Sequence, residues 1–320
     1  MNAPLLDVRN LEVRFPVRRG AFGQPSAWVK AVDGVSFTVE RGEVLGLVGE
    51  SGSGKSTAGL ATLRLVPSQA GEILFDGVDI ASQSRAQLRP LRQRMQIVFQ
   101  DPFASLNPRL TIDATLAEPM AIHGKPDIKL RIARLLDRVG LPASFAQRYP
   151  HQLSGGQRQR VAIARALATE PDLIVADEPV SALDVSIQAQ ILELLESLRR
   201  DLGLAMLLVA HNLGVVEYVC DRVAVMYLGR IVEVAPAAGL YRRPHHPYTR
   251  ALLAAMPVIG AARRPAMPPL TGEMPSPIDP PSGCTFRTRC PNALPACAER
   301  RPPLVEIAPG HTSACIRNDI

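Results

Sequence analysis

The sequence predicts an α/β fold built on a largely parallel sheet, in a chain of 320 residues. Three short apolar runs, each with the length of a buried strand, support this: residues 44–48, 173–176 and 204–210. The first two are followed by polar loops and then by segments with helical periodicity at about 57–66 and 187–198. Apolar residues make up 47% of the chain and charged residues 21%, which is enough apolar material for packed cores.

No segment of the sequence predicts membrane insertion or secretion. The longest apolar runs, such as residues 204–210, are much shorter than the roughly 20 residues that cross a bilayer. Charged residues from Asp7 to Arg14 interrupt the N-terminal segment, which argues against a secretory signal. We therefore expect a soluble protein of a reducing compartment.

Charge and proline set the C-terminal third apart. The net charge is 36 − 30 = +6, and residues 222–320, with 12 arginines and 6 acidic residues, hold all of the excess. Of the 29 prolines, 16 lie between Pro236 and Pro309. We predict an α/β body over 1–235, a linking segment with one short helix over 236–265, and a small Cys-rich tail over 266–320. A solvated tail is favoured over one that binds nucleic acid, because no block of five basic residues occurs.

The segment between strand 44–48 and the first helix matches the phosphate-loop pattern G-x-x-x-x-G-K-[ST]. Its glycines let backbone N–H groups turn towards phosphate oxygens, and the following helix N-terminus is partly positive. Lys55 is expected to reach the β- and γ-phosphates, and the Ser56 hydroxyl to bind Mg²⁺. A Gly/Ser loop that only turns a corner is disfavoured by this context. The predicted nucleotide-binding residues are Gly49, Glu50, Ser51, Gly52, Ser53, Gly54, Lys55, Ser56 and Thr57.

Two acidic residues end the strand at 173–176, at the sheet edge where α/β proteins bind ligands. Asp177 is the expected partner of Mg²⁺, and Glu178 is positioned to take a proton from the attacking water.

A second anion site is predicted where Leu153–Gln157 precedes a helix at 158–168. Ser154 fits the N-cap, and Gly155 and Gly156 leave backbone N–H groups free at the helix start. One chain has no evident use for two triphosphate sites. A second copy is therefore expected to bring its Ser154 loop over the γ-phosphate of the first.

Taken together, these motifs resemble those of the ATP-binding subunits of ABC transporters over about residues 5–235. The resemblance identifies residues 49–57 as the Walker A motif and residues 173–178 as the Walker B motif with its catalytic glutamate. It identifies Leu153–Gln157, which ends in Gln157, as the LSGGQ signature. It implies a P-loop NTPase (RecA-like) core, an ABC β-subdomain and an inserted α-helical subdomain at about 101–157. Residues 101–119 are the expected docking surface for the membrane subunits, and the apolar stripe at 128–139 is expected to be core.

The same resemblance assigns further site residues. Gln100 corresponds to the Q-loop glutamine that senses Mg²⁺ and the membrane partner, and Ser181–Asp184 to the D-loop, which adds Asp184 to the nucleotide site. His211 corresponds to the switch histidine that contacts the γ-phosphate, although Ala210 and Asn212 stand where the family more often has Ser and Asp. Phe15 occupies the position of the aromatic that stacks on adenine; a strand-core role is the alternative, and Trp28 is a rival.

Three C-terminal segments resemble those of the oligopeptide/dipeptide importer ATPases: Pro244–Thr249, Gly272–Pro277 and Cys284–Cys297. Such importers have two paired ATPases, and residues 180–190 resemble the corresponding segment of the second one. This implies an ATPase at the cytoplasmic face of the inner membrane, bound peripherally, that drives peptide import. Its partners would be a paired ATP-binding subunit (identical or a paralogue), two permease subunits and an external substrate-binding protein, with no nucleic acid.

Two alternatives remain open. The first is the same class of transporter with nickel, glutathione or antimicrobial-peptide cargo. The second, a non-transport ABC ATPase, is disfavoured because the chain has one nucleotide domain and no long coiled-coil insertion. His245 and His246 are expected to form a solvated turn without a metal.

Four cysteines in the tail, spaced C-x5-C-x6-C-x17-C, suggest a shared metal centre at Cys284, Cys290, Cys297 and Cys315. Disulfides are disfavoured in a reducing compartment. Structural zinc sites usually use closely spaced cysteine pairs, which are absent here. A [4Fe–4S] cluster is therefore favoured over zinc, as the subfamily resemblance also implies, and unligated thiols come third. Cys220 is expected to be a buried core thiol.

Overall fold

The structure is a computed structural model that describes residues 3–18, 25–181, 183–255, 270 and 272–317. These residues form two compact units. The first unit contains the described residues of 1–5, 39–43 and 82–208, and the second those of 6–38, 44–81 and 209–320. The described C-terminal residues therefore share a unit with the glycine-rich loop at 49–57, from which they are distant in the sequence.

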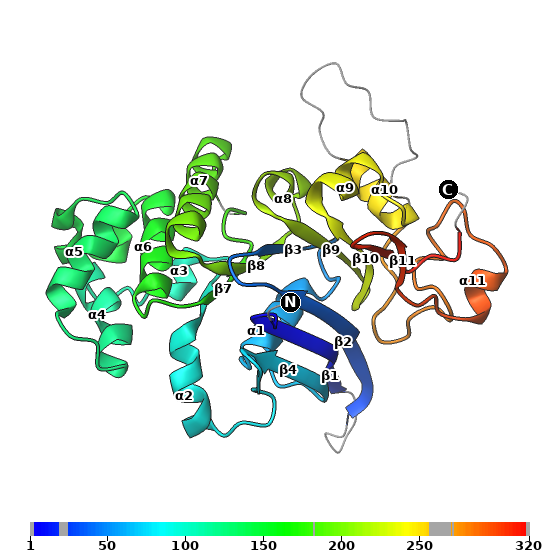
Figure 1. Cartoon of the computed structure of the whole chain (residues 1–320), viewed down its shortest axis with the longest axis horizontal. Helices are drawn as coiled ribbons and strands as arrows, with labels where there is room; N and C mark the ends of the chain where they lie inside the picture. The colour runs from blue at the N-terminus through cyan, green and yellow to red at the C-terminus, as the bar shows by residue number, and fades with distance from the viewer. Residues whose placement is uncertain (1–2, 19–24, 182, 256–269, 271, 318–320) are drawn as a thin grey trace. The chain divides into compact units, whose positions relative to one another are not determined.

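The second unit contains a four-stranded antiparallel sheet. Its strand order is β2 (Pro25–Val39), β1 (Leu6–Arg18), β4 (Ala70–Phe75) and β5 (Val78–Asp79) (Figure 1). Strand β1 pairs with β4 from Leu6 opposite Phe75 onwards, and both of these side chains are buried. Burial of alternate apolar side chains fixes this register, because a slip by one residue would turn them to solvent.

A second group of strands in the same unit carries the glycine-rich loop. Strand β3 (Val44–Val48) is buried throughout and pairs in parallel with β9 (Arg222–Tyr227). Strand β9 continues antiparallel to β10 (Arg230–Pro236), β10 to β12 (His311–Ser313), and β12 to β11 (Val305–Ala308). Strands β12 and β11 thus extend this part of the sheet.

The helices of the second unit are short: α1 (Lys55–Thr62), α8 (Leu213–Val219), α9 (Ala237–Arg242), α10 (Pro247–Ala254) and α11 (Ala296–Glu299). The expectation of one short helix in the linking segment 236–265 is wrong, because both α9 and α10 lie there. Proline explains the division: α9 ends before Pro244, and Pro247 occupies the first position of α10, where its missing N–H costs nothing.

Helices dominate the first unit, and α4 (Ile112–Ile122), α5 (Ile128–Arg138) and α6 (Gly155–Leu167) lie together in Figure 1. The apolar stripe of α5 is core as expected, since Ile132, Leu135 and Leu136 are buried. The unit also holds α2 (Arg85–Arg94), α3 (Pro102–Ser105), α7 (Val185–Leu202) and 3-10 turns at Ala143–Gln147 and Pro150–Gln152.

Two strands of the first unit pair in parallel and lead into predicted site residues. Strand β6 (Met95–Val98) pairs with β7 (Leu173–Asp177) from Met95 opposite Leu173 onwards. Strand β8 (Ala205–Ala210) begins in this unit and ends in the second. Strands β7 and β8 match the strands expected from the apolar runs at 173–176 and 204–210 within one residue.

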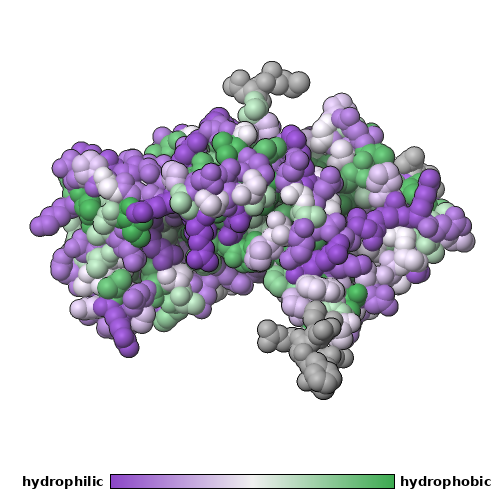
Figure 2. Space-filling view, turned by 90° about the horizontal axis from the view of Figure 1, so that it is seen from below, coloured by the Kyte–Doolittle hydropathy of each residue, from purple (hydrophilic) through white to green (hydrophobic). Residues whose placement is uncertain are grey.

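The described helices include none that is long and apolar enough to cross a membrane. On the face drawn in Figure 2, hydrophilic residues are interspersed with groups of hydrophobic ones.

Candidate functional site

At two positions of the loop between β3 and α1, the backbone has a conformation and surroundings that only glycine can adopt. Gly49 and Gly54 have φ angles of +154° and +100°. A Cβ at Gly49 would lie 2.1 Å from the carbonyl oxygen of Met226, and one at Gly54 would lie 2.0 Å from that of Ala31. These contacts are with backbone, which cannot move aside, so the glycines permit the close approach of neighbouring strands to the loop.

Lys55 is the first residue of α1 and lies over the loop. Its side chain is buried, and Nζ donates hydrogen bonds of 2.8 Å to the carbonyl oxygens of both Gly49 and Glu50. Gly54 is the N-cap of this helix, so the cap residue itself has no side chain to bond the first-turn N–H groups. A cationic side chain and a helix N-terminus at one glycine-rich loop form the arrangement that binds phosphate.

Two residues that sequence reasoning missed hold the same loop from the C-terminal region. The backbone N–H of Glu50 donates to the hydroxyl of Tyr248 at 2.9 Å. The guanidinium of Arg289 donates to both carboxylate oxygens of Glu50, at 2.7 and 3.0 Å. Both residues lie in segments singled out by resemblance, but no local signal pointed to their contacts with the loop.

The end of β7 brings two predicted residues into contact. Asp177 is buried at the last position of the strand, and Glu178 follows with a φ angle of +44°, a conformation that non-glycine residues rarely adopt. Gln100 donates a hydrogen bond of 2.8 Å from Nε2 to Oε2 of Glu178. The side chains predicted to handle Mg²⁺ and the attacking water therefore meet.

The start of α6 has the geometry expected for Ser154. Its hydroxyl accepts a hydrogen bond from the backbone N–H of Gln157, and Oε1 of Gln157 accepts one from the N–H of Ser154, which is a capping box. A Cβ at Gly156 would lie 2.6 Å from Cγ2 of Ile187, so this glycine lets α6 approach α7. Asp184 stands at the N-cap of α7.

The aromatic candidates are both exposed. Phe15 in β1 is 40% exposed, which makes the alternative of a strand-core role wrong, and Trp28 in β2 is 45% exposed. His211 is exposed directly after β8. Residues 19–24, which lie between Phe15 and Trp28, and Ala182 of the D-loop segment lie outside the described residues.

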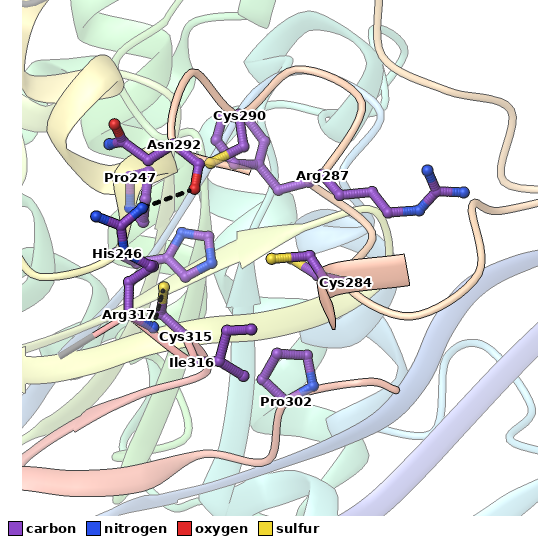
Figure 3. Close-up of a pocket in the computed structure, with 12 residues that line it drawn as sticks. His246, Pro247, Cys284, Arg287, Cys290, Asn292, Pro302, Cys315, Ile316 and Arg317 are labelled. Atoms are coloured by element: carbon purple, nitrogen blue, oxygen red, sulfur yellow. Dashed lines mark hydrogen bonds between the residues drawn. The ribbon is translucent and has the colours of Figure 1, made fainter. Parts of the chain in front are cut away.

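The four cysteines of the C-terminal region line one pocket, together with His246. Figure 3 shows Cys284, Cys290 and Cys315 around the same space, while Arg287 extends away from it. Among the described residues, however, no three His, Cys, Asp or Glu side chains are arranged closely enough to hold a metal ion. The structure therefore does not support the predicted cluster. Burial, reinforced by the other three cysteines, raises the pKa of the Cys284 thiol to about 11.

The expectation of a solvated turn at His245 and His246 is wrong. His246 is 1% exposed and caps α10, where its Nδ1 accepts a hydrogen bond from the N–H of Tyr248. Burial lowers the pKa of His246 to about 4, so the ring is neutral at pH 7. The buried carboxylate of Glu233 accepts the backbone N–H groups of both histidines, at 2.7 and 3.0 Å. This buried partner could not be recognised from the His-His pair alone.

Many of the arginines that make the C-terminal third basic have partners within the protein. Arg289 pairs with Glu50, Arg230 with Asp33 at 2.7 Å, and Arg250 donates to the carbonyl oxygen of Pro244. Part of the positive charge of this region is therefore engaged in contacts within the protein.

The fold and the loop at 49–57 define an α/β nucleotide-binding protein. The ABC transporter family model matches residues 32–181, and the model of the oligopeptide/dipeptide transporter C-terminal region matches residues 232–297. A putative peptide import ATP-binding protein of Brucella ovis is 55% identical over 320 residues, covering 99% of each chain. The oligopeptide transport ATP-binding protein AppF of Bacillus subtilis is 51% identical, covering 97% of this chain and 96% of AppF.

Solved structures agree with this fold. A dimeric post-hydrolysis state of the ATP-binding cassette MJ0796, bound to ADP and Pi, has a TM-score of 0.64 at 28% identity and covers 72% of this chain and 98% of its own. CbiO1 of Clostridium perfringens, part of the ABC transporter complex cbiONQ, has a TM-score of 0.64 at 29% identity, covering 76% and 92%. The chain belongs to the ABC transporter ATP-binding proteins that carry the oligopeptide/dipeptide transporter C-terminal region. As a member of that family it is an ATP hydrolase that uses ATP and Mg²⁺.

Proposed function

We propose that this chain is the ATPase subunit of an importer of di- and oligopeptides, as its named relatives are. One observation carries the proposal: the C-terminal region of oligopeptide and dipeptide transporters follows the cassette in the same chain, at residues 232–297. The similarity to peptide import ATP-binding proteins extends over 99% of the chain, so it is not confined to the nucleotide-binding part.

Within this function, each predicted site residue has a proposed role. The loop at 49–57 binds the phosphates, with Lys55 on the β/γ-phosphates and Ser56, Gln100 and Asp177 towards Mg²⁺. Glu178 takes the proton of the attacking water, and its bond from Gln100 at 2.8 Å supports a shared task. His211 contacts the γ-phosphate, and Phe15 or Trp28 stacks on adenine. Mg²⁺ would neutralise charge that develops on the phosphates.

The catalytic assembly we propose is a head-to-tail dimer. The Ser154 loop of one chain would cover the γ-phosphate bound by the Lys55 loop of another, with Gly155, Gly156, Gln157 and Asp184 beside it. Its support is the start of α6, where two glycines follow the serine that caps the helix. ATP binding would close the dimer and hydrolysis would reopen it.

The partners and the location follow from the same proposal. The second ATPase is identical or a paralogue, and two permease subunits and an external substrate-binding protein complete the transporter. The chain would then be peripheral on the cytoplasmic face of the inner membrane. Residues 1–235 would act as the nucleotide-binding domain, with the helical part at 101–157 facing the permeases, and 266–320 as the Cys-rich C-terminal part.

A four-cysteine metal centre remains part of the proposal, as a [4Fe–4S] cluster or, alternatively, zinc. Its support is that all four cysteines line one pocket although they span residues 284–315. Thiolates of Cys284, Cys290, Cys297 and Cys315 would hold it after side-chain rotation, since their present placement does not form a metal site. Its role would be structural or redox-sensing, because ATP hydrolysis needs no electron.

Reconstitution tests the proposed function. The chain is incorporated with its permeases and paired ATPase into proteoliposomes, and uptake of labelled di- and pentapeptides is measured in the presence of the binding protein. We expect ATP-dependent uptake of peptides. Uptake of Ni²⁺ or glutathione without peptide uptake would support the alternative cargo, and ATP hydrolysis with no uptake of any of these would contradict the transport role.

A further inference from the structure

Glu50 places a carboxylate in the loop that has to receive the phosphates of ATP. A negative charge there opposes nucleotide binding unless a cation lies beside it. The cation is Arg289, whose two Nη atoms bind the two carboxylate oxygens at 2.7 and 3.0 Å. Because the Arg289 side chain is only 5% exposed and Glu50 28%, solvent screens this pair far less than a surface ion pair.

A buried aromatic cluster lies next to Arg289 and positions it towards the phosphate loop. Phe286 packs against Tyr227 of β9 and Tyr248 of α10, with ring centroids 5.2 and 5.3 Å away. The backbone N–H of Arg289 bonds to the carbonyl oxygen of Phe286 at 3.0 Å, so a tight turn connects the arginine to the cluster. The position of the guanidinium is therefore set by packing and does not depend on a flexible surface chain.

Tyr248 holds the same loop residue by its backbone, through the bond of 2.9 Å from the N–H of Glu50. Tyr248 and Arg289 both lie within residues 232–297, the matched C-terminal region, and all of these residues belong to the second unit. One residue of the phosphate loop is thus held at its backbone and at its side chain by a segment about 200 to 240 positions away in the sequence.

We propose that Arg289 is a positioning residue for ATP binding: its bidentate ion pair neutralises and orients Glu50, so that the C-terminal region sets the phosphate affinity of the loop. The inference rests on the proposed nucleotide site. The expected effect is on binding of ATP, because the partner of Arg289, Glu50, belongs to the phosphate loop.

The test measures Mg-ATP dissociation constants of the purified full chain by displacement of a fluorescent ATP analogue, with turnover at saturating ATP. We expect Arg289→Ala to raise the Kd about tenfold and to change kcat less than about twofold. Arg289→Lys keeps the positive charge but cannot form the bidentate pair, so its Kd should lie between those of the unmodified chain and Arg289→Ala. The double variant Glu50→Gln with Arg289→Ala should return most of the lost affinity, because no unpaired carboxylate remains.

Arg287→Ala is the matched control, because the guanidinium of Arg287 donates within its own loop, to the carbonyl oxygen of Ser282 at 2.8 Å. It should bind ATP as the unmodified chain does, and thermal unfolding of every variant reports on folding. Unchanged Kd in Arg289→Ala, or a double variant as weak as Arg289→Ala alone, would overturn the inference. Failure of the unmodified chain to bind ATP would instead overturn the proposed nucleotide site.

Discussion

The carboxylate of Glu233 on β10 lies 2.7 Å from Nε2 of His311 on β12, and both residues are buried. The pair joins two antiparallel strands, and the same carboxylate accepts the N–H groups that precede α10. Burial by itself would raise the pKa of Glu233, but the hydrogen bonds from His311 and from the N–H groups of His245 and His246 outweigh it and lower this pKa. The ionised form is therefore the one the fold stabilises.

Glu233→Gln should lower the free energy of unfolding by about 2 kcal/mol, because an amide cannot accept all of these bonds. Since the folded pKa lies below the unfolded one, the contribution of Glu233 is complete above about pH 4.5 and is lost as pH falls through the folded pKa. The variant should lose less stability than the unmodified chain on acidification. Urea unfolding at pH 7 and pH 4 measures both effects.

Glu306→Gln is the control for this change, because Glu306 is exposed on β11. It should alter stability by less than about 0.5 kcal/mol. A Glu233→Gln protein as stable as the Glu306→Gln one would mean that the buried pair contributes nothing to the fold.

Glu178→Gln should reduce ATP turnover at least about 100-fold while ATP binding persists, because the amide cannot take a proton from water. The carbonyl oxygen of Gln can still accept the bond from Gln100, so the local geometry should survive. Steady-state hydrolysis and size-exclusion chromatography with ATP, which should reveal a trapped dimer, check this. Glu193→Gln, an exposed change on α7, is the control. Near-normal turnover in Glu178→Gln would remove this residue from the mechanism.

Ser154→Arg should abolish hydrolysis without weakening ATP binding to the isolated chain, because in the proposed head-to-tail dimer this serine would face a phosphate bound by another subunit. The matched control is Ser84→Arg: Ser84 also caps a helix, α2, through a capping box with a glutamine three residues later. Both variants should lose about 1 kcal/mol of stability with the cap, but only Ser154→Arg should lose hydrolysis. Equal loss of ATP binding by the Ser154→Arg monomer would indicate that the signature acts within its own chain.

Anaerobic purification followed by iron, sulfide and zinc analysis should find a [4Fe–4S] cluster, with four irons and four sulfides per chain. Cys290→Ser should remove the metal, because one of four ligands is lost, whereas Cys220→Ala, outside the pocket, should retain it. If the analysis finds one zinc per chain, and Cys290→Ser loses it, the four-cysteine centre is a zinc site and not an iron–sulfur cluster. Absence of both metals from the unmodified chain would leave a pocket of free thiols.

Local sequence was sufficient where the chemistry is local. The buried strand 44–48, the glycines of the loop and the Ser154 capping box all depend on residues within a few positions of one another, and each has the predicted geometry. The family resemblance rested on these same segments, which is why it was confirmed.

Only the tertiary structure decided which distant segments meet. Glu50 and Arg289 are 239 positions apart, and nothing in the neighbourhood of either residue identifies the other. His246 looked like part of a solvated turn until its burial under the aromatic cluster became visible, and Phe15 looked equally suited to core or surface. Hydrophobic periodicity and glycine placement report a residue's own backbone conformation, whereas burial and ion pairing depend on the packing of the whole unit. The sequence by itself therefore determined the class of fold and the phosphate loop, and the tertiary structure decided what holds that loop in place.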